Sequence, residues 1–252
     1  IVPAEGFCTD VFFRQAKKFM KEQVESGKPF FAYISTNAPH GPLHCPQKYL
    51  DMYSGQSAKI AAFFGMITNI DDNVGSTRQY LEDLGVSDNT LFIFTTDNGT
   101  ATGNEVFNAG MRGKKGSEYD GGHRVPFIAH WPAGGWNTKH QCDILCHAVD
   151  VVPTVVGLAG GRKPQSLQWD GVSIETLLDP KKEPAVGDRM LVTDSQRIRD
   201  PIKWRKTAVM SQQWRLINGE QLFEIKKDPG QKNDIAADHP QQVKKMKAFY
   251  DS

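Results

Sequence analysis

Three loops that follow apolar stretches carry polar side chains capable of chemistry. In one of them, TLFIFTTDNGT from Thr90 to Thr100, a run of β-formers ends in Asp97 and Asn98. Turn chemistry alone explains Asp-Asn-Gly at the end of a strand. A carboxylate beside a side-chain amide, at the carboxyl end of a strand, is also a typical donor set for a hard cation. The stretch therefore predicts either a turn or a metal site with Asp97 and Asn98 as ligands.

A second loop, NAPHGPLH, holds His40 between Pro39 and Pro42. The prolines restrict the backbone on either side, so the imidazole is stiffly placed. A histidine held in this way can donate a proton or bind an anion. The alternative is an ordinary solvated loop histidine.

A third loop, RGKKGSEYDGG, places Arg112, Lys114 and Lys115 among glycines. Glycines allow close approach of the backbone to a ligand, and together with lysines they suggest phosphate or sulfate binding. The P-loop spacing GxxxxGK[ST] is absent, which argues against a nucleotide site. A solvated basic loop is the alternative interpretation.

Other polar residues have simpler explanations. Asp71 and Asp72 are neighbouring carboxylates, but a helix cap or a solvated helix face accounts for them, and Asp150 in HAVDVVPT is interpreted as structural. The four cysteines are too few and too scattered for a secreted disulfide framework. HQCDILCH could suggest zinc, but its Cys spacing differs from standard zinc knuckles. The possible zinc ligands of HQCDILCH are His140, Cys142, Cys146 and His147. The other two cysteines of the chain are Cys8 and Cys45.

The elements that must position these loops alternate between helix and strand. Helix between apolar strands is typical of an α/β fold with a mostly parallel central sheet flanked by helices. We expect Pro29–Thr36 to be a strand buried on both faces, because it is a continuous apolar run. Helices are expected at about 9–25, with Thr9 as N-cap, at 57–84 and at 147–160, and further strands at 90–96 and 125–132.

Near residue 186 the expected pattern changes from alternating helices and strands to hairpin strands, which predicts a domain boundary. Residues 1–186 are expected to form the α/β core and residues 187–252 a small α+β subdomain. In the subdomain, residues 206–217 and 220–229 read as two strands of a hairpin that turns at Asn218 and Gly219. A short amphipathic helix, PQQVKKMKAFYD, closes the chain.

Bulk composition excludes several classes of function. The chain has 252 residues, enough for a sizeable core, and a formal net charge of +1. Without a strong field of one sign, the charge does not favour nucleic acid or an anionic membrane as partner. No apolar run approaches the roughly 20 residues of a membrane span.

Three stretches together resemble the sulfatases of the alkaline-phosphatase-like superfamily. They are, in order, PFFAYISTNAPHGP, IDDNVGSTRQYLEDLGVSDNTLFIFTTDNG and MRGKKGSEYDGGHRVPFIAHWP. Later stretches, HAVDVVPTVVGLAG, WDGVSIETLLDP and QLFEIKKDPGQKNDIA, are similar to further landmarks of the same family. The resemblance extends over nearly the whole chain and implies an arylsulfatase-type sulfuric ester hydrolase.

The resemblance also implies roles for individual residues. One divalent cation, usually calcium, would be held in part by Asp97 and Asn98. His40 of the PH.P motif and Lys115 of the GKG..Y.GG motif would contact the sulfate group. Cations and a proton donor at this position stabilise charge on the leaving oxygen. The expected substrate is a sulfated small molecule or sulfated carbohydrate. Because periplasmic, secreted and lysosomal members dominate the family, the resemblance implies one of these locations.

One family motif is missing. C/S-x-P-S-R, whose Cys or Ser becomes the formylglycine nucleophile, does not occur in this sequence, and CPQKY at Cys45 is no substitute because it lacks Ser-Arg. Calcium takes about six to eight oxygens, of which Asp97 and Asn98 supply about three. We therefore expect the distal part of a sulfatase, with formylglycine in an N-terminal part and weak calcium binding by this part alone.

Two alternatives remain open. A phosphoesterase or phosphonate monoester hydrolase of the same superfamily would use a Thr or Ser nucleophile and two zinc ions. A non-catalytic relic would bind a sulfated glycan or a partner protein without turnover. In each case Trp169, Trp204 and Trp214 could stack on a sugar or aryl ring, or pack in the core.

Overall fold

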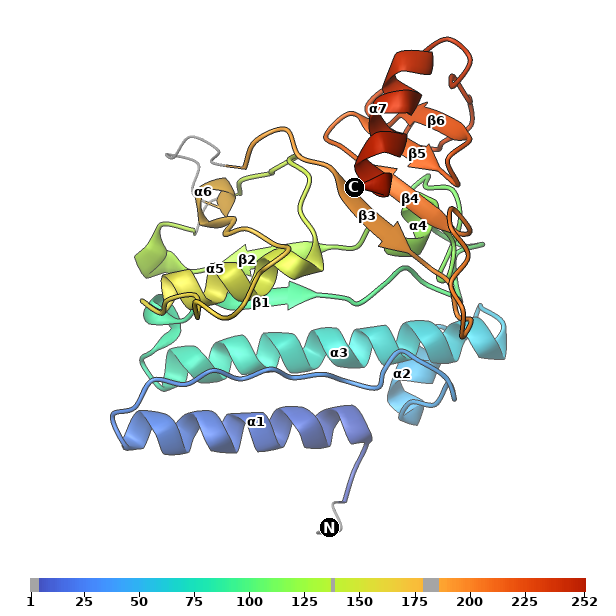
Figure 1. Ribbon diagram of the computed structural model, residues 1–252. Helices are drawn as coiled ribbons and strands as arrows, with labels where there is room; N and C mark the ends of the chain where they lie inside the picture. Colours follow the sequence, from blue (N-terminus) through green and yellow to red (C-terminus); the bar gives the residue numbers. More distant parts are fainter. Residues whose placement is uncertain (1–4, 137–138, 179–185) are drawn as a thin grey trace. The chain divides into compact units, whose positions relative to one another are not determined.

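The computed structural model describes residues 5–136, 139–178 and 186–252 (Figure 1). Internal contacts divide the chain into two compact units. Unit 1 comprises residues 1–91 and 131–133, and unit 2 comprises residues 92–130 and 134–252. Each unit is described by itself.

Unit 1 is built on two long helices, α1 (Cys8–Glu25) and α3 (Ala58–Asp83), which contact each other. α1 buries Phe13 and Met20, seven residues apart and hence on one helical face. Both predicted helices are confirmed. Ser57 caps α3 by accepting a hydrogen bond from the Ile60 N–H, whereas the predicted N-cap of α1 is wrong: Thr9 lies buried in the first turn. The unit also contains two shorter helices, α2 (Gln47–Asp51) and the 3-10 helix η1 (Ser87–Asn89).

The strand predicted at Pro29–Thr36 is not found. Figure 1 draws this segment as a trace without a strand, and the residues make no ladder. Exposure alternates along it, with Phe31 at 72% and Tyr33 at 81%. This alternation is that of an extended chain, but burial on both faces needs neighbouring strands, and the described part of the chain supplies none.

In unit 2, the strand of the Asp97 loop is paired antiparallel. β1 (Phe92–Thr95) pairs with β2 (Phe127–His130), with Phe92 opposite His130. The two strands form a sheet of their own, so no parallel ladder exists among the described residues. The short helices of unit 2 are α4 (Asp120–His123), η3 (Ala148–Asp150), α5 (Val151–Leu158) and α6 (Glu175–Leu178). The 3-10 helix η2 (Pro132–Gly134) follows β2 and lies at the point where the chain passes from unit 1 back to unit 2.

The C-terminal segment forms an antiparallel sheet in the order β3-β4-β5-β6. The turn at Asn218 and Gly219 is confirmed, and both residues have the positive φ that a type I′ turn requires. The single strand predicted at 206–217 is wrong, because residues 211–213 turn the chain and divide it into two strands. The strands are β3 (Leu191–Asp194), β4 (Thr207–Met210), β5 (Trp214–Ile217) and β6 (Gln221–Glu224).

The closing helix, α7 (Pro240–Asp251), has the predicted bounds. Its Met246 is fully buried against Val209, Leu216 and Leu222 of the sheet. This sheet and its helix lie entirely after residue 186, although the predicted domain boundary itself stays a prediction. None of the helices in the described ranges combines the length and apolar character needed to cross a membrane.

Candidate active site

Asp97 and Asn98 lie just past the end of β1, where the sequence predicts either a turn or a metal site. The Asp97 side chain is exposed, and Asn98 Nδ2 donates a hydrogen bond to Asp97 Oδ2. No other hydrogen bond or ion pair within the described residues reaches the Asp97 carboxylate. The loop therefore presents a carboxylate oxygen and the Asn98 amide oxygen to solvent, which are two hard donors on adjacent residues.

This loop is locked to the glycine-rich loop by backbone hydrogen bonds. The Gly99 N–H donates to the Gly122 carbonyl over 2.9 Å, and the Lys115 N–H donates to the Thr100 carbonyl over 2.9 Å. A Cβ at Gly99 would lie 1.9 Å from the Gly121 carbonyl oxygen. Only glycine permits that approach, so the two loops form one unit that carries Asp97, Asn98 and Lys115 together.

The same contacts correct the interpretation of the glycines. The sequence suggests that they allow a ligand to approach the backbone. In the structure Gly121 and Gly122 instead face backbone, because added Cβ atoms would meet the Gly113 carbonyl oxygen at 2.5 Å and the Ser117 carbonyl oxygen at 2.0 Å. Gly121 and Gly122 therefore serve the packing of loop on loop.

The three basic side chains of this loop differ in their surroundings. Arg112 stacks on the Tyr119 ring at 3.8 Å and donates from Nη1 to the Gln231 carbonyl over 2.9 Å. These two contacts give the Arg112 guanidinium a structural role. Lys114 is exposed, Lys115 is half-buried, and neither ammonium has a hydrogen-bond or ion-pair partner in the part of the chain that the structure describes. Lys115 is therefore a half-buried lysine whose ammonium is available to an anion.

A buried polar layer supports the glycine-rich loop. Asp120 is buried and accepts a hydrogen bond from Arg215 Nε over 3.1 Å, with His123 Nε2 at 4.0 Å. The Asp120 N–H donates to Gln231 Oε1 over 2.8 Å. Burial lowers the pKa of His123 despite the neighbouring carboxylate, which favours the neutral imidazole. Sequence reasoning missed this layer because its partners are 95 and 111 residues apart.

His40 belongs to unit 1 and is exposed. Its Nδ1 lies 2.8 Å from the Gly41 carbonyl oxygen. A carbonyl only accepts, so Nδ1 carries the proton and donates, which leaves Nε2 as the nitrogen that faces other groups. The His40 N–H donates to the Asn37 carbonyl over 2.9 Å, which fixes the turn.

The family model described as Sulfatase matches residues 4–161. The chain belongs to the sulfatase family. The match includes the Asp97 loop, the Lys115 loop and the His40 loop, so all the residues proposed from the motifs lie within it.

Relatives and solved structures agree with this sulfatase assignment. The N-acetylgalactosamine-6-sulfatase of Homo sapiens is 31% identical over 176 residues, which cover 68% of this chain and 32% of the relative. The N-acetylgalactosamine-6-O-sulfatase of Bacteroides thetaiotaomicron is 26% identical over 275 residues, with 96% and 50% covered. Ps i-CgsB in complex with k-i-k-neocarrahexaose superposes with a TM-score of 0.86 at 26% identity, covering 99% of this chain and 56% of that one.

Two conclusions follow from the coverage. The chain has the α/β, alkaline-phosphatase-like fold of the solved sulfatases. It also spans only about a third to a half of the length of the curated relatives that it matches.

The candidate metal ligands of this sulfatase chain fit part of a calcium shell. Asp97 and Asn98 offer exposed oxygens, the donor type that calcium prefers. The described residues contain no group of three or more His, Cys, Asp or Glu side chains placed to hold a metal ion. The two residues can therefore be ligands only as part of a larger donor set.

The absence of a metal-binding group among the described residues also removes support for the zinc interpretation of HQCDILCH. The Cys146 thiol donates to the Ile144 carbonyl, and burial raises its pKa to about 11, which disfavours the thiolate that zinc needs. Cys45 is buried, and burial raises its pKa as well, in keeping with its exclusion as a nucleophile.

The neighbouring carboxylates Asp71 and Asp72 do not act as a pair, since the Tyr49 hydroxyl donates a hydrogen bond to Asp72 Oδ2 over 2.8 Å.

Asp150 is structural, as its sequence context indicates. The buried carboxylate accepts hydrogen bonds from Arg189 Nη1 and Nη2, at 2.8 and 2.5 Å, and from the N–H groups of Val172 and His147. Burial alone would raise the pKa of Asp150, but these hydrogen bonds outweigh it and hold the pKa below its ordinary value.

The three candidate aromatic platforms also have structural partners. Trp204 packs against the Tyr250 ring at 4.1 Å, and Trp214 packs against the His239 ring at 5.0 Å. Both belong to the hydrophobic cluster between the C-terminal sheet and α7. Trp169 lies 5.9 Å from the Lys163 ammonium. Trp204 and Trp214 are therefore half-buried side chains that pack against the edge of the core.

Proposed function

We propose that this chain supplies part of the active site of an arylsulfatase-type enzyme that cleaves sulfate esters. The observation that carries the proposal is the interlocked pair of loops, which holds Asp97, Asn98 and the unpartnered Lys115 on one rigid support. A hydrolase for sulfate esters needs a cation for the anionic group and hard oxygen ligands for a metal ion. Both are present on this support.

Each residue has a role that its surroundings allow. Asp97 and Asn98 would be ligands of a calcium ion, which when bound polarises the sulfate group. The Lys115 ammonium would bind a sulfate oxygen, at low cost because it gives up no other partner. His40, whose Nδ1–H is held by the Gly41 carbonyl, would donate the proton of Nε2 to the leaving oxygen from its doubly protonated imidazolium form, which leaves the neutral Nδ1–H imidazole behind. The formylglycine nucleophile would come from sequence outside this chain.

The proposed substrate is a sulfated carbohydrate. Relatives named as sulfatases of N-acetylgalactosamine, and a solved relative in complex with k-i-k-neocarrahexaose, support this class over a simple aryl sulfate. A location in the periplasm, outside the cell or in lysosomes remains part of the proposal, consistent with the calcium available in those places.

Two competing functions make different predictions. A phosphoesterase or phosphonate monoester hydrolase would cleave the phosphate analogue faster and would need a second metal ion. A non-catalytic relic would bind a sulfated glycan without releasing sulfate. The Sulfatase family model and the half-buried, unpartnered Lys115 on the same support as the proposed metal ligands favour sulfate.

The test is sulfate release by the complete protein as its gene encodes it. N-acetylgalactosamine 6-sulfate, an aryl sulfate and the corresponding phosphates serve as substrates, and released anion is measured by ion chromatography. We expect sulfate release, with Lys115→Ala lowering kcat/KM by about 100-fold or more, as for loss of one charge-stabilising donor. Lys114→Ala is the matched control and should change it by less than about threefold, because its exposed ammonium makes no contact. Faster phosphate release, or equal losses for the two variants, would overturn the proposal.

A further inference from the structure

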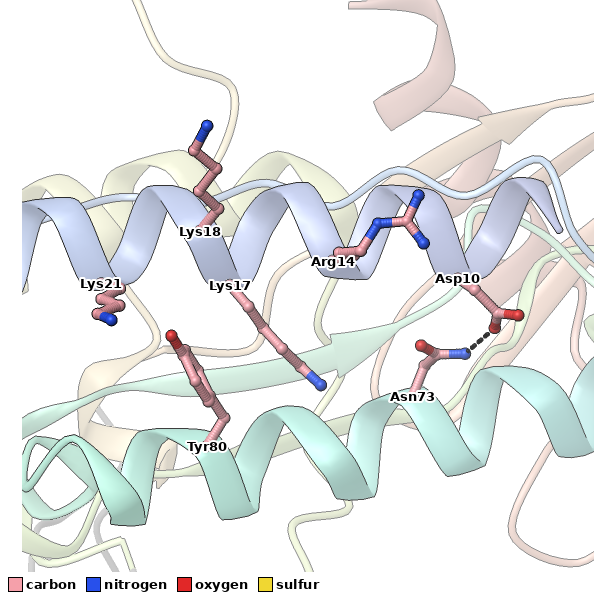
Figure 2. A pocket seen from close by; sticks show the side chains of 7 residues that line it. All are labelled: Asp10, Arg14, Lys17, Lys18, Lys21, Asn73 and Tyr80. Carbon is pink, nitrogen blue, oxygen red and sulfur yellow. Dashed lines mark hydrogen bonds between the residues drawn. The ribbon is translucent and has the colours of Figure 1, made fainter. Parts of the chain in front are cut away.

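Unit 1 contains a groove of about 390 Å³ between α1 and α3. Figure 2 shows its lining from α1 above and α3 below, with Lys17 and Tyr80 reaching into the space between the helices. A volume of this size is typical of small-ligand sites, which start at about 300 Å³. Its lining residues are Asp10, Arg14, Lys17, Lys18, Lys21, Asn73 and Tyr80.

The groove is basic because one face of α1 is basic. Arg14, Lys17 and Lys21 are spaced three and four residues apart, so they lie along one side of the helix. By helical rise they span about 10 Å, roughly the length of one disaccharide. Lys18 differs, because its ammonium points away from α3 and lies 4.0 Å from Glu22 (Figure 2).

Two of these cations lack an anionic partner. Lys17 Nζ donates to Ser76 Oγ over 2.5 Å and lies 5.9 Å from the centroid of the Tyr80 ring, and both partners are neutral. Arg14 donates only to the Glu5 carbonyl, over 2.9 Å. Within the described residues neither forms an ion pair. Burial lowers the pKa of Lys17, which is the sign of a cation losing solvent without gaining a counter-charge.

One acidic side chain lines the groove, and it keeps its negative charge because its hydrogen-bond donors are neutral amides. Asp10 Oδ1 accepts hydrogen bonds from Asn69 Nδ2 and Asn73 Nδ2, at 2.7 and 2.8 Å. Lys21 lies 3.6 Å from Glu25 in an exposed pair that solvent weakens. The lining as a whole still carries an excess of positive charge, with Arg14, Lys17, Lys18 and Lys21 against Asp10, and Lys17 reaches into the space between the helices (Figure 2).

The neutral groups in the groove fit a sugar. The Tyr80 ring offers a face on which a sugar ring can stack, and the side-chain amide of Asn73 can bond to sugar hydroxyls. Unpaired cations at two neighbouring positions favour an anionic substituent on that sugar. Nucleic acid would need a longer basic track than this one, and the net charge of +1 does not provide it.

We propose that the α1–α3 groove is a binding site for a sulfated saccharide chain, separate in sequence from the residues assigned to catalysis. The site takes the anionic substituents on Arg14, Lys17 and Lys21 and the sugar ring on Tyr80. In its choice of ligand this inference rests on the proposed function, since it assumes that the enzyme meets sulfated carbohydrate. It requires no turnover, so it can be tested without activity.

The test is equilibrium binding of a fluorescein-labelled, heparin-derived tetrasaccharide, measured by fluorescence anisotropy at low salt. We expect Lys17→Gln to weaken binding about tenfold, the effect of losing one charge-assisted contact. Arg14→Gln and Lys21→Gln should each weaken it severalfold, and these exposed positions guard against a folding defect in the Lys17 variant. Lys59→Gln is the matched control, because Lys59 is an exposed lysine of α3 outside the groove lining and removes the same charge.

The competing outcomes are distinct. Loss of affinity in the groove variants alone, together with loss on chemical desulfation of the probe, supports the proposal. Equal affinity in the groove variants and in Lys59→Gln overturns it. Equally tight binding of a DNA oligonucleotide of the same charge also overturns it, because the site would then not be built for a saccharide. Sulfate release by the same variants from a small aryl sulfate reports separately on the proposed function, and it should not change.

Discussion

Replacing Asp150 with Ala should destabilise the protein more than any surface change in unit 2. The wild-type carboxylate is fully buried and accepts four hydrogen bonds, two of them from Arg189. Removing it leaves a half-buried guanidinium and two backbone N–H groups without their acceptor. Breaking one partner of a buried ion pair costs about 3–5 kcal/mol. We expect a loss of that size in the free energy of unfolding.

The assay is urea unfolding followed by tryptophan fluorescence at pH 7, with Asp200→Ala as control. Asp200 is exposed and unpaired among the described residues, so its replacement should cost less than about 0.5 kcal/mol. The double variant Asp150→Ala/Arg189→Met should lose less than the sum of the two single variants, because neither charge is then left unpaired. Additive losses, or a loss for Asp150→Ala below about 1 kcal/mol, would refute the role assigned to this pair.

The contribution of Asp150 to stability should also depend on pH in a definite direction. The folded-state pKa of Asp150 lies below its ordinary value of 3.8. The ionised carboxylate therefore contributes stability that is present above pH 3.8 and is lost as the pH falls through the folded-state value. The difference in unfolding free energy between wild type and Asp150→Ala should be constant from pH 7 to about 5 and should shrink below 3.8.

Three further outcomes are expected. Gly99→Ala should cost about 1–3 kcal/mol or more by urea unfolding, because its Cβ would lie 1.9 Å from the Gly121 carbonyl oxygen, whereas Gly75→Ala, in open space on α3, should gain about 0.5–1 kcal/mol. A loss at Gly75 equal to that at Gly99 would contradict this. Iodoacetamide at pH 8, read by peptide mass spectrometry, should label exposed Cys8 well before buried Cys45, whose pKa burial raises. Equal labelling rates in the folded protein would show that the Cys45 pocket is open. Lys115→Ala should lower kcat/KM for sulfate release by about 100-fold while Lys114→Ala does not, and equal losses would count against the role of Lys115.

Elements with local signals could be predicted from the sequence. α1, α3 and α7 follow from helical periodicity, and the turn at Asn218 and Gly219 follows from two residues that tolerate positive φ. The extended segment at Pro29–Thr36 shows the limit of such signals. Its composition predicts burial on both faces, but a strand also needs partners, and composition does not say whether the chain contains them.

The candidate site divides in the same way. Motifs propose Asp97, Asn98, His40 and Lys115 as site residues, because each motif is a short local pattern, and their roles stay predictions. The support beneath them is not local, since Arg215 reaches Asp120 across 95 residues of sequence. The sequence interpretation also assigned the glycines to the approach of a ligand. A pattern of glycines indicates that something lies too close for a Cβ atom, but it does not say whether that neighbour is a ligand or, as at Gly121 and Gly122, another stretch of backbone.

The calcium dependence of sulfate release is the most direct test of the central claim that Asp97 and Asn98 hold the metal of a sulfatase site. Sulfate release by the complete protein is measured across a calcium titration for wild type, Asp97→Ala and the exposed control Asp71→Ala. The account predicts that Asp97→Ala raises the calcium concentration for half-maximal rate by about tenfold or more, the loss of one charged ligand, while Asp71→Ala matches wild type. An unchanged calcium requirement in Asp97→Ala, or sulfate release that needs no calcium in the presence of EGTA, would contradict it.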